Sequence, residues 1–598
     1  MKTFNRYKDI PPTETIERNK KILEGLGIEI EEEVIHNTNN IWTSHLNFPS
    51  ICFGTNGKGT TELFCKASAY GEALERIQNG ICSVQWKNAT KEAYNSDGFN
   101  FFIDEKKGLL KGIFNRYPYF YAPVAEDFYI MEHRYPSGPK EMESLLRSYI
   151  PDEIRYIPFF DYKRKNIEYL PFEIVEFLSC TNGLCSGNTP HEALVQGLSE
   201  VCERFVEPFI YKNHLTPPEV PKTYIEKNYS YLFNIINELE KQSNSFIYVY
   251  DCSIGKQFPV VCVLMIEKST QTYRVQYGSH PLFSIALERC LTELTQGYNI
   301  SNYADLRNST TIFNLENAYV SDNMEDRFIN GNGNCNVEFF FKKPSWEWNE
   351  NNFISTEGYT NKKGFDFLIN TLSQVSENIF IRDNSILGVP AYAIFIPGVN
   401  TFPLGFGWCS LEQEDAFNCL DKLSDVKETF IKLQENSTWK NVCKYLLDFL
   451  NSHDRLYKRY PYININYFSN YESLNVIKAC LCREMGNIDG LIFYLESLHS
   501  SNPIIKGICL EEKLVKGGID EDNRLSIIEK FLGITAKNFI EDIWRNPKYL
   551  QNIVYQEEVL SDEEKTLYQN QLDKVLLSIK EVQKKNGPID QKGLEKLL

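Results

Sequence analysis

The stretch TNGLCSGNTPHEALVQGLSEVCER, residues 181–204, joins a polar turn to a helix whose start is clearly marked. Thr189 is predicted to be the N-cap residue, Pro190 the first helical residue and Glu192 the reciprocal partner in a capping box. A proline at the first helical position costs no hydrogen bond, because the N–H that it lacks has no partner within the helix. The sequence therefore predicts that a helix begins here.

Polar side chains recur along this helix at steps of three or four residues, which places them on one face. They are Glu192, Gln196, Glu200, Glu203 and Arg204. Carboxylates stacked one turn apart repel each other, so we expect cations to lie among them. A single face of this kind is more often a solvated surface, and it does not predict a site by itself.

Two further segments repeat the pattern. KASAYGEALER (66–76) follows the Gly-rich turn TNGKGT (55–60), and SIALERCLTELTQG (284–297) again places a Glu-Arg pair one turn before another glutamate. The Gly-rich turn lacks the spacing of a Walker A loop. Three carboxylate–arginine faces predict helices that converge on one highly charged ligand. A nucleoside triphosphate with magnesium fits, because carboxylates bind hard cations and Arg or Lys binds phosphates.

Three long motifs in this order resemble the YcaO family. They are CF followed by TNGKG near the N-terminus, GN-x-x-x-E-A-x-V-Q-G-L-S-E-V-x-E-R in the middle, and HP-x-F-x-x-ALER-x-x-TEL-x-QG after it. The resemblance covers nearly the whole chain. It is closest to full-length bacterial members that serve as accessory factors for β-methylthiolation of a small-subunit ribosomal protein.

The resemblance implies ATP and Mg²⁺ as cofactors and leaves the catalytic residue unassigned. It implies four metal ligands, Glu72, Glu75, Glu200 and Glu203. It implies ATP contacts for Lys8, Thr15, Ser68, Arg76, Cys185, Asn188, Glu192, Gln196, Arg204 and Arg289. Cys185 stands where the similar proteins have serine, and Ser186 beside it is the alternative.

In that family, ATP phosphorylates the oxygen of a peptide amide after a nucleophile has added to the carbonyl. The leading hypothesis is an accessory protein that acts with a radical-SAM methylthiotransferase on a ribosomal protein, as a homodimer. A peptide-backbone cyclodehydratase or thioamide-forming enzyme is the alternative enzyme, and an ATP-binding scaffold is the third hypothesis. The final segment KNGPIDQKGLEKLL (585–598) lacks the Pro-x-Pro-x-Pro ending of many azole-forming members, which disfavours an azoline synthase.

Composition narrows the classes of function. A net charge of −17 argues against a nucleic-acid surface. No apolar run approaches 18 residues, so we expect a cytoplasmic protein with no membrane partner. The 16 cysteines include no CxxC pair and no zinc spacing, and they are predicted to be reduced, mostly buried thiols.

A length of 598 residues predicts more than one domain. Short apolar runs at 99–103, 247–251, 260–266, 337–341 and 392–396 predict strands, and hence a mixed α/β YcaO-type ATP-binding core over residues 1–405. Beyond it, helical periodicity predicts an all-helical domain over residues 406–598. A helical hairpin at 472–498 resembles a tetratricopeptide repeat.

Overall fold

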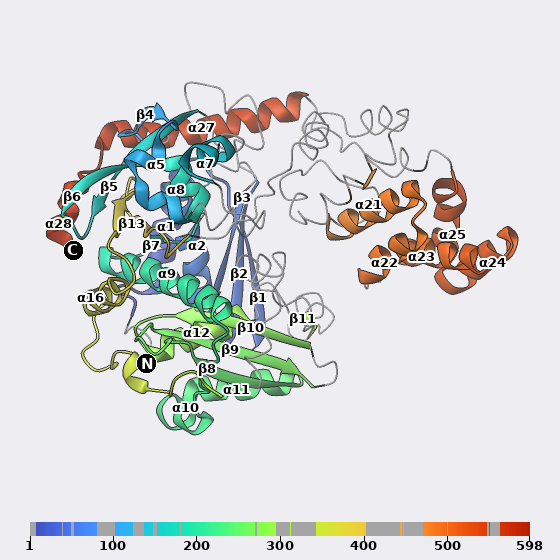
Figure 1. Ribbon diagram of the computed structural model, residues 1–598, viewed down its shortest axis with the longest axis horizontal. Helices are drawn as coiled ribbons and strands as arrows, with labels where there is room; N and C mark the ends of the chain where they lie inside the picture. Colours follow the sequence, from blue (N-terminus) through green and yellow to red (C-terminus); the bar gives the residue numbers. More distant parts are fainter. Residues whose placement is uncertain are drawn as a thin grey trace. The chain divides into compact units, whose positions relative to one another are not determined.

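The computed structural model describes two compact units of this chain, one formed by residues 1–404 and 566–598 and the other by residues 405–565 (Figure 1). The residues that it describes are 7–38, 40–49, 53–80, 102–123, 137–146, 152–179, 181–268, 272–294, 311–312, 343–401, 443–444, 447, 470–498, 500, 502–546, 549 and 562–598. The second unit is helical in its described part, and the first is a mixed α/β core, as predicted.

The described residues of the first unit form three antiparallel sheets. One has the order β1–β2–β3 (Glu31–Thr38, Ile41–Phe48, Phe53–Gly59). The next has the order β11–β10–β9–β8 (Thr311–Ile312, Thr272–Ser279, Val260–Glu267, Ser245–Asp251). The last has the order β4–β5–β12–β13–β7 (Lys106–Leu109, Glu153–Asp161, Phe380–Asp383, Ala391–Phe395, Leu184–Ser186), with β6 (Asn166–Pro171) also paired to β5.

Helices cover these sheets, and α9 (Pro190–Lys212) is the longest of the described helices within residues 7–401. The others in this range are α1 (Pro12–Gly25), α2 (Glu62–Gln78), α5 (Ile113–Arg116), η2 (Pro118–Phe120), α7 (Pro139–Leu146), α8 (Phe172–Ser179), α10 (Lys222–Asn228), α11 (Ser230–Gln242), α12 (Phe283–Glu293), η4 (Glu350–Asn352) and α16 (Asn361–Leu372). The apolar face of α9 is buried in a core shared with β9, β10 and β13. Its polar face is therefore left for the cavity described below.

The order helix, three strands, helix occurs twice in the first unit, as α1–β1–β2–β3–α2 and as α11–β8–β9–β10–α12 (Figure 1). Helix α2 begins at Glu62 and α12 begins at Phe283, which is 221 residues later. Gly57 and Gly278 are separated by the same interval, and each lies where the closing helix crosses the last strand. A Cβ atom at either glycine would overlap the backbone of that helix. The two segments are thus copies of one structural unit.

The predicted Gly-rich turn at 55–60 is wrong for most of its length, because these residues form strand β3. The glycines are needed for a different reason. A Cβ atom at Gly57 would collide with the carbonyl oxygen of Cys65, and one at Gly59 would lie 2.7 Å from the Cys65 nitrogen. Glycine in a strand often marks such a close approach of another backbone. The glycines of this stretch therefore indicate close helix–strand packing rather than a chain reversal.

Three of the predicted strands are confirmed as β8, β9 and β13. The predicted strand at 337–341 lies outside the described residues, as do residues 99–101 of the strand predicted at 99–103. The remaining two residues of that segment, 102 and 103, are not in a strand.

The second unit contains a run of helices in its described part. They are α21 (Asn470–Met485), α22 (Ile488–Ser497), α23 (Pro503–Lys516), α24 (Glu521–Leu532), α25 (Ile534–Phe539) and the π-helical turn η5 (Ile540–Trp544). The predicted helical hairpin corresponds to α21 and α22. Gly486 turns the chain with a φ of 78°, and the Asn487 side chain caps α22 by accepting from the Gly490 N–H. A tetratricopeptide-like character stays a prediction.

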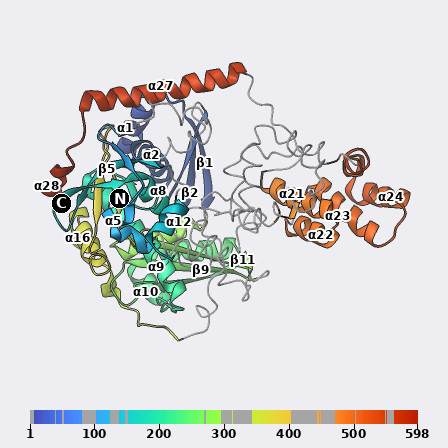
Figure 2. The same ribbon diagram turned by 45° about the horizontal axis from the view of Figure 1, so that its top comes forward.

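The C-terminal segment departs from the expected division, because residues 566–598 belong to the first unit rather than to a helical domain over 406–598. It comprises most of α27 (Asp562–Asn586), together with η6 (Gln591–Gly593) and α28 (Leu594–Leu597) (Figure 2). Gln591 fixes it by exchanging two hydrogen bonds of 2.8 Å with the Asp383 backbone, and Leu594 is buried in the core of α9. Among the described helices, none is long and apolar enough to cross a membrane.

Candidate functional site

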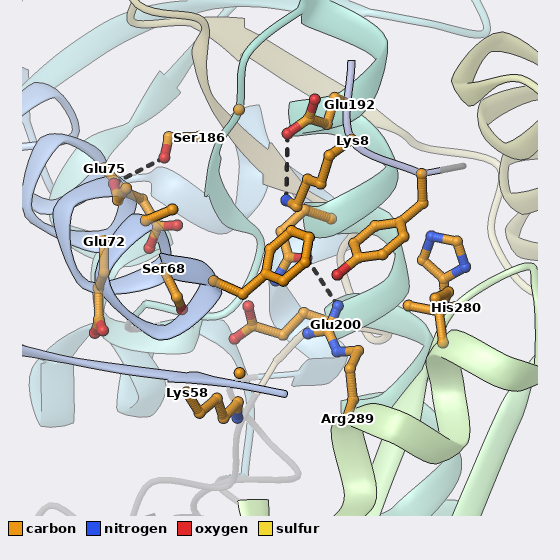
Figure 3. A pocket seen from close by; sticks show the side chains of 18 of the residues that line it. Lys8, Lys58, Ser68, Glu72, Glu75, Ser186, Glu192, Glu200, His280 and Arg289 are labelled. Carbon is orange, nitrogen blue, oxygen red and sulfur yellow. Dashed lines mark hydrogen bonds and ion pairs between the residues drawn. The ribbon is translucent and has the colours of Figure 1, made fainter. Parts of the chain in front are cut away.

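The polar face of α9 forms one wall of a cavity of about 650 Å³. The other walls are the N-terminal segment with α1, the end of β3 with α2, residues 186–188, and β10 with α12. Figure 3 shows side chains from these elements pointing into a shared space. All three predicted carboxylate–arginine faces therefore meet in one cavity.

The start of α9 is as predicted, with Pro190 in its first turn and the Thr189 side chain accepting from the Glu192 N–H at 3.3 Å. The Glu192 carboxylate, however, binds the N-terminal segment. It accepts from the Asp9 N–H at 2.8 Å and lies 3.2 Å from Lys8 Nζ (Figure 3). Glu192 is 4% exposed and Lys8 is partly exposed, so the ion pair is shielded from water on its carboxylate side. The expected capping residue thus anchors the N-terminal segment, which lies more than 180 residues earlier in the sequence.

Helix α1 contributes its first turns to the same corner. Thr15 Oγ1 donates to Asn188 Oδ1 at 2.9 Å, and Arg18 Nη2 donates to the same atom at 3.1 Å. Lys8, Thr15 and Asn188 were predicted as nucleotide contacts, and the structure brings them together. Arg18 was missed, although its position three residues after Thr15 places it on the same helix face.

The four expected metal ligands lie on two facing helices, with Glu72 and Glu75 on α2 and Glu200 and Glu203 on α9. Burial raises the pKa of Glu75 to about 8; Arg76 counters this, while Glu200 and Glu72 add to it. Burial also raises the pKa of Glu200. The carboxylates of the two helices raise each other's pKa values, which indicates that the neighbouring cations do not fully balance their negative charge.

Arg76 bridges the α2 pair, with Nη2 3.2 Å from Glu72 and Nη1 3.7 Å from Glu75. Within the described residues, no three His, Cys, Asp or Glu side chains are arranged to hold a metal ion unaided. Mg²⁺ commonly binds through one or two carboxylates plus substrate phosphates. These carboxylates, whose negative charge is not fully balanced, therefore fit Mg²⁺ ions that arrive with a phosphate ligand.

Cationic side chains also line the cavity and lie close enough to the carboxylates to shift their pKa values. Arg289 Nη1 donates to Gln196 Oε1 at 2.8 Å, which links α12 to α9 (Figure 3). Lys58, at the end of β3, forms an ion pair with Glu293. Burial, followed by the nearby Arg289 charge, lowers the pKa of Lys58 to about 8. A buried lysine next to another cation is a good position for phosphate.

Aromatic side chains that the sequence did not point to line a further part of the cavity. The Tyr7 ring stacks on Phe64 with centroids 6.5 Å apart and meets His280 edge-on at 5.9 Å. His280 Nδ1 accepts from the Leu282 N–H at 3.0 Å, and burial lowers the pKa of this imidazole. The contact between Tyr7 and His280 joins segments 273 residues apart, so no local pattern predicts it.

Every expected site residue lines the cavity except Cys185. Its side chain is fully buried on the other face of β7, where a Cβ atom at Gly197 would come 2.8 Å from its sulfur. Ser186 lines the cavity in its place and donates from Oγ to the Gly71 carbonyl at 2.8 Å (Figure 3). The expectation that Cys185 faces the site is therefore wrong, and Ser186 faces the cavity instead because successive strand residues alternate.

Comparison with known proteins gives a consistent family. A family model described as YcaO cyclodehydratase, ATP- and Mg²⁺-binding, matches residues 56–400. The chain is 31% identical over 408 residues to the ribosomal protein S12 methylthiotransferase accessory factor YcaO of Escherichia coli, covering 67% of this chain and 66% of that protein. It is 30% identical over 412 residues to an uncharacterized protein of Haemophilus influenzae, with the same coverage. Each match spans about two thirds of the relative's length.

Two solved structures resemble the chain at lower identity. One is a heterocyclase in complex with substrate and cofactor, with a TM-score of 0.45 and 15% identity over 66% of this chain and 53% of that one. The other is YcaO from Methanopyrus kandleri bound with AMPPCP and Mg²⁺, with a TM-score of 0.40 and 16% identity over 66% of this chain and 94% of that one.

Proposed function

Because this chain belongs to the YcaO family, whose members bind ATP and Mg²⁺, we propose that it uses ATP to activate the oxygen of a peptide amide in the cavity described above. The observation that carries the proposal is the meeting of three helix faces from α2, α9 and α12 in that cavity. They bring acidic and basic side chains into one space, which is the arrangement needed to bind Mg²⁺ and phosphates together.

We assign three roles to the residues that line the cavity. Glu72, Glu75, Glu200 and Glu203 would hold Mg²⁺, which when bound neutralises the charge on the transferring phosphoryl group. Arg289 and Lys58 would face the phosphates. Ser68, Arg76, Asn188, Glu192, Gln196, Arg204, Lys8 and Thr15 would hold the rest of the nucleotide or fix the carboxylates. These assignments rest on the location of each side chain in the cavity wall.

The biological role that we propose is that of an accessory factor for β-methylthiolation of a small-subunit ribosomal protein, together with a radical-SAM methylthiotransferase. Its support is the 31% identity to the Escherichia coli accessory factor. The test is complementation of an E. coli strain that lacks its own YcaO, read as the mass gain of one methylthio group on ribosomal protein S12. Glu203→Ala should fail to restore that mass, and unmodified S12 with the wild-type chain would contradict this role.

The nucleotide site is tested by calorimetric titration of Mg·ATP into the full chain. The wild-type protein should bind, and Glu203→Ala should lose at least ten-fold in affinity, because one ligand to the metal is removed. Glu226→Ala is the matched control, since Glu226 is exposed on α10. Absence of binding by the wild-type protein would refute the nucleotide site. Equal binding by all three proteins would refute the metal assignment alone.

A further inference from the structure

Glu288 lines the cavity, but the roles assigned above do not use it. Other carboxylates of the cavity have cationic partners, such as Lys8 for Glu192 and Lys58 for Glu293. Among the described residues, no Lys, Arg or His nitrogen lies within the 4.0 Å limit of an ion pair with Glu288. Glu288 is partly withdrawn from water, and a carboxylate in such a position without a cationic partner calls for a functional explanation.

Neutral hydroxyl groups surround Glu288 instead. Thr60 Oγ1, just beyond β3, donates to its Oε1 at 3.5 Å, and the Tyr231 hydroxyl of α11 also hydrogen bonds to the carboxylate. Burial and then the Glu288 charge raise the pKa of the Tyr7 hydroxyl in the N-terminal segment. Arg289 is the neighbouring residue on α12. Such hydroxyls hold a carboxylate in place and leave it able to accept a proton.

Burial raises the pKa of Glu288 to about 7, while the hydrogen bonds from Thr60 and Tyr231 hold it from rising further. A group that titrates near the working pH is well matched to general acid–base catalysis. Glu288 is also not one of the carboxylates assigned to Mg²⁺. The Glu288 carboxylate can therefore take up a proton during a reaction at the phosphates.

We propose that Glu288 is the general base of phosphoryl transfer in this cavity, accepting a proton from the nucleophile that attacks the γ-phosphate. This inference rests on the proposed ATP-dependent function. With water as the nucleophile, the water O–H bond breaks and its proton moves to a Glu288 oxygen. The water oxygen bonds to the γ-phosphorus, the bond from that phosphorus to the β–γ bridging oxygen breaks, and ADP leaves with the bonding electron pair.

The experiment measures hydrolysis of Mg·ATP by the full chain between pH 5.5 and 9, with water as the probe nucleophile. Wild-type kcat should rise with pH and level off above about 7. Glu288→Gln should lower kcat by about 100-fold or more, leave KM within three-fold and abolish the rise. Tyr231→Phe should keep most of the plateau but move the rise to higher pH, because a hydrogen bond that favours the carboxylate is lost.

Glu226→Gln, on exposed α10, is the control and should match the wild type. A wild-type protein that does not bind Mg·ATP by calorimetry would refute the proposed function itself. If it binds without turnover, or if Glu288→Gln keeps the wild-type rate and pH profile, only the assignment of Glu288 is overturned. Should Glu288→Gln lose nucleotide binding, the Tyr231→Phe profile decides, and an unchanged profile overturns the assignment.

Discussion

Binding of Mg·ATP is expected to exchange protons with the solvent, and the direction should reverse near pH 8. Glu75 has a pKa raised to about 8 by burial, so it holds a proton at neutral pH that Mg²⁺ must displace. Lys58 has a pKa lowered to about 8, so it takes up a proton when a phosphate approaches. Binding of Mg·ATP therefore releases protons overall below pH 8 and takes them up overall above it.

The magnitude follows from the two titration curves. At pH 7.5, about three quarters of Glu75 is protonated and about one quarter of Lys58 is deprotonated, so about 0.5 proton is released per ATP bound. At pH 9, the balance becomes an uptake of about 0.8 proton. The raised pKa of Glu200 adds to the release and moves the crossing upward. The γ-phosphate contributes little in this range, because its own pKa is near 6.

The assay is calorimetry in buffers of different ionisation enthalpy, since the slope of the observed enthalpy against that quantity is the number of protons exchanged. Lys58→Met should leave release only, about 0.8 proton at pH 7.5 and about 0.1 at pH 9. Glu75→Gln should leave an uptake of about 0.2 at pH 7.5. A proton number for the wild type that stays constant from pH 7.5 to 9 would refute the reasoning.

Three further predictions concern the stability of the first unit, followed by thermal and denaturant unfolding. Gly57→Ala should destabilise it by about 3 kcal/mol or more, because the new Cβ meets the α2 backbone, whereas Gly25→Ala, with open space around it, should be neutral. Asp104→Asn should cost about 3 kcal/mol, because Arg382, 4% exposed, would lose a two-pronged ion pair at 2.7 and 3.0 Å; a loss under 0.5 kcal/mol would contradict this. Without nucleotide, stability should fall as pH rises from about 4.5 to 8, because folded Glu75 binds its proton more tightly than the unfolded chain does, and Glu75→Gln should flatten that fall.

Helix faces were predictable from the sequence because they depend on local spacing. The face of α9 and the pair on α2 needed only the period of an α-helix, and both lie in the cavity as expected. Strand β3 was missed, because the glycines that let α2 approach it are also the residues typical of a turn. The sequence could not decide whether Cys185 or Ser186 faces the site. Strand register determines which of two neighbouring side chains does so, and a shift of one residue exchanges them.

Contacts between distant segments could not be predicted. The sequence marks Glu192 as a capping residue, but nothing near it indicates that Lys8 and the Asp9 amide occupy its carboxylate. Tyr7 and His280 are likewise ordinary aromatic residues until the fold brings them together. Such pairs are fixed by how the elements that line the cavity are placed in the fold, which periodicity does not specify.

The repeated helix–strand–helix unit bears on how the cavity forms during folding. Its linking contacts are very long in sequence: Arg289 reaches back 93 residues to Gln196, and Thr60 reaches forward 228 residues to Glu288. Contacts of such separation form slowly, because a long loop must close before they stabilise anything. A chain emerging from the ribosome could complete the first copy by residue 78 and still have no nucleotide site until α12 has been synthesised. ATP would then act as a ligand of the assembled unit alone, favouring it by mass action over every partly folded form.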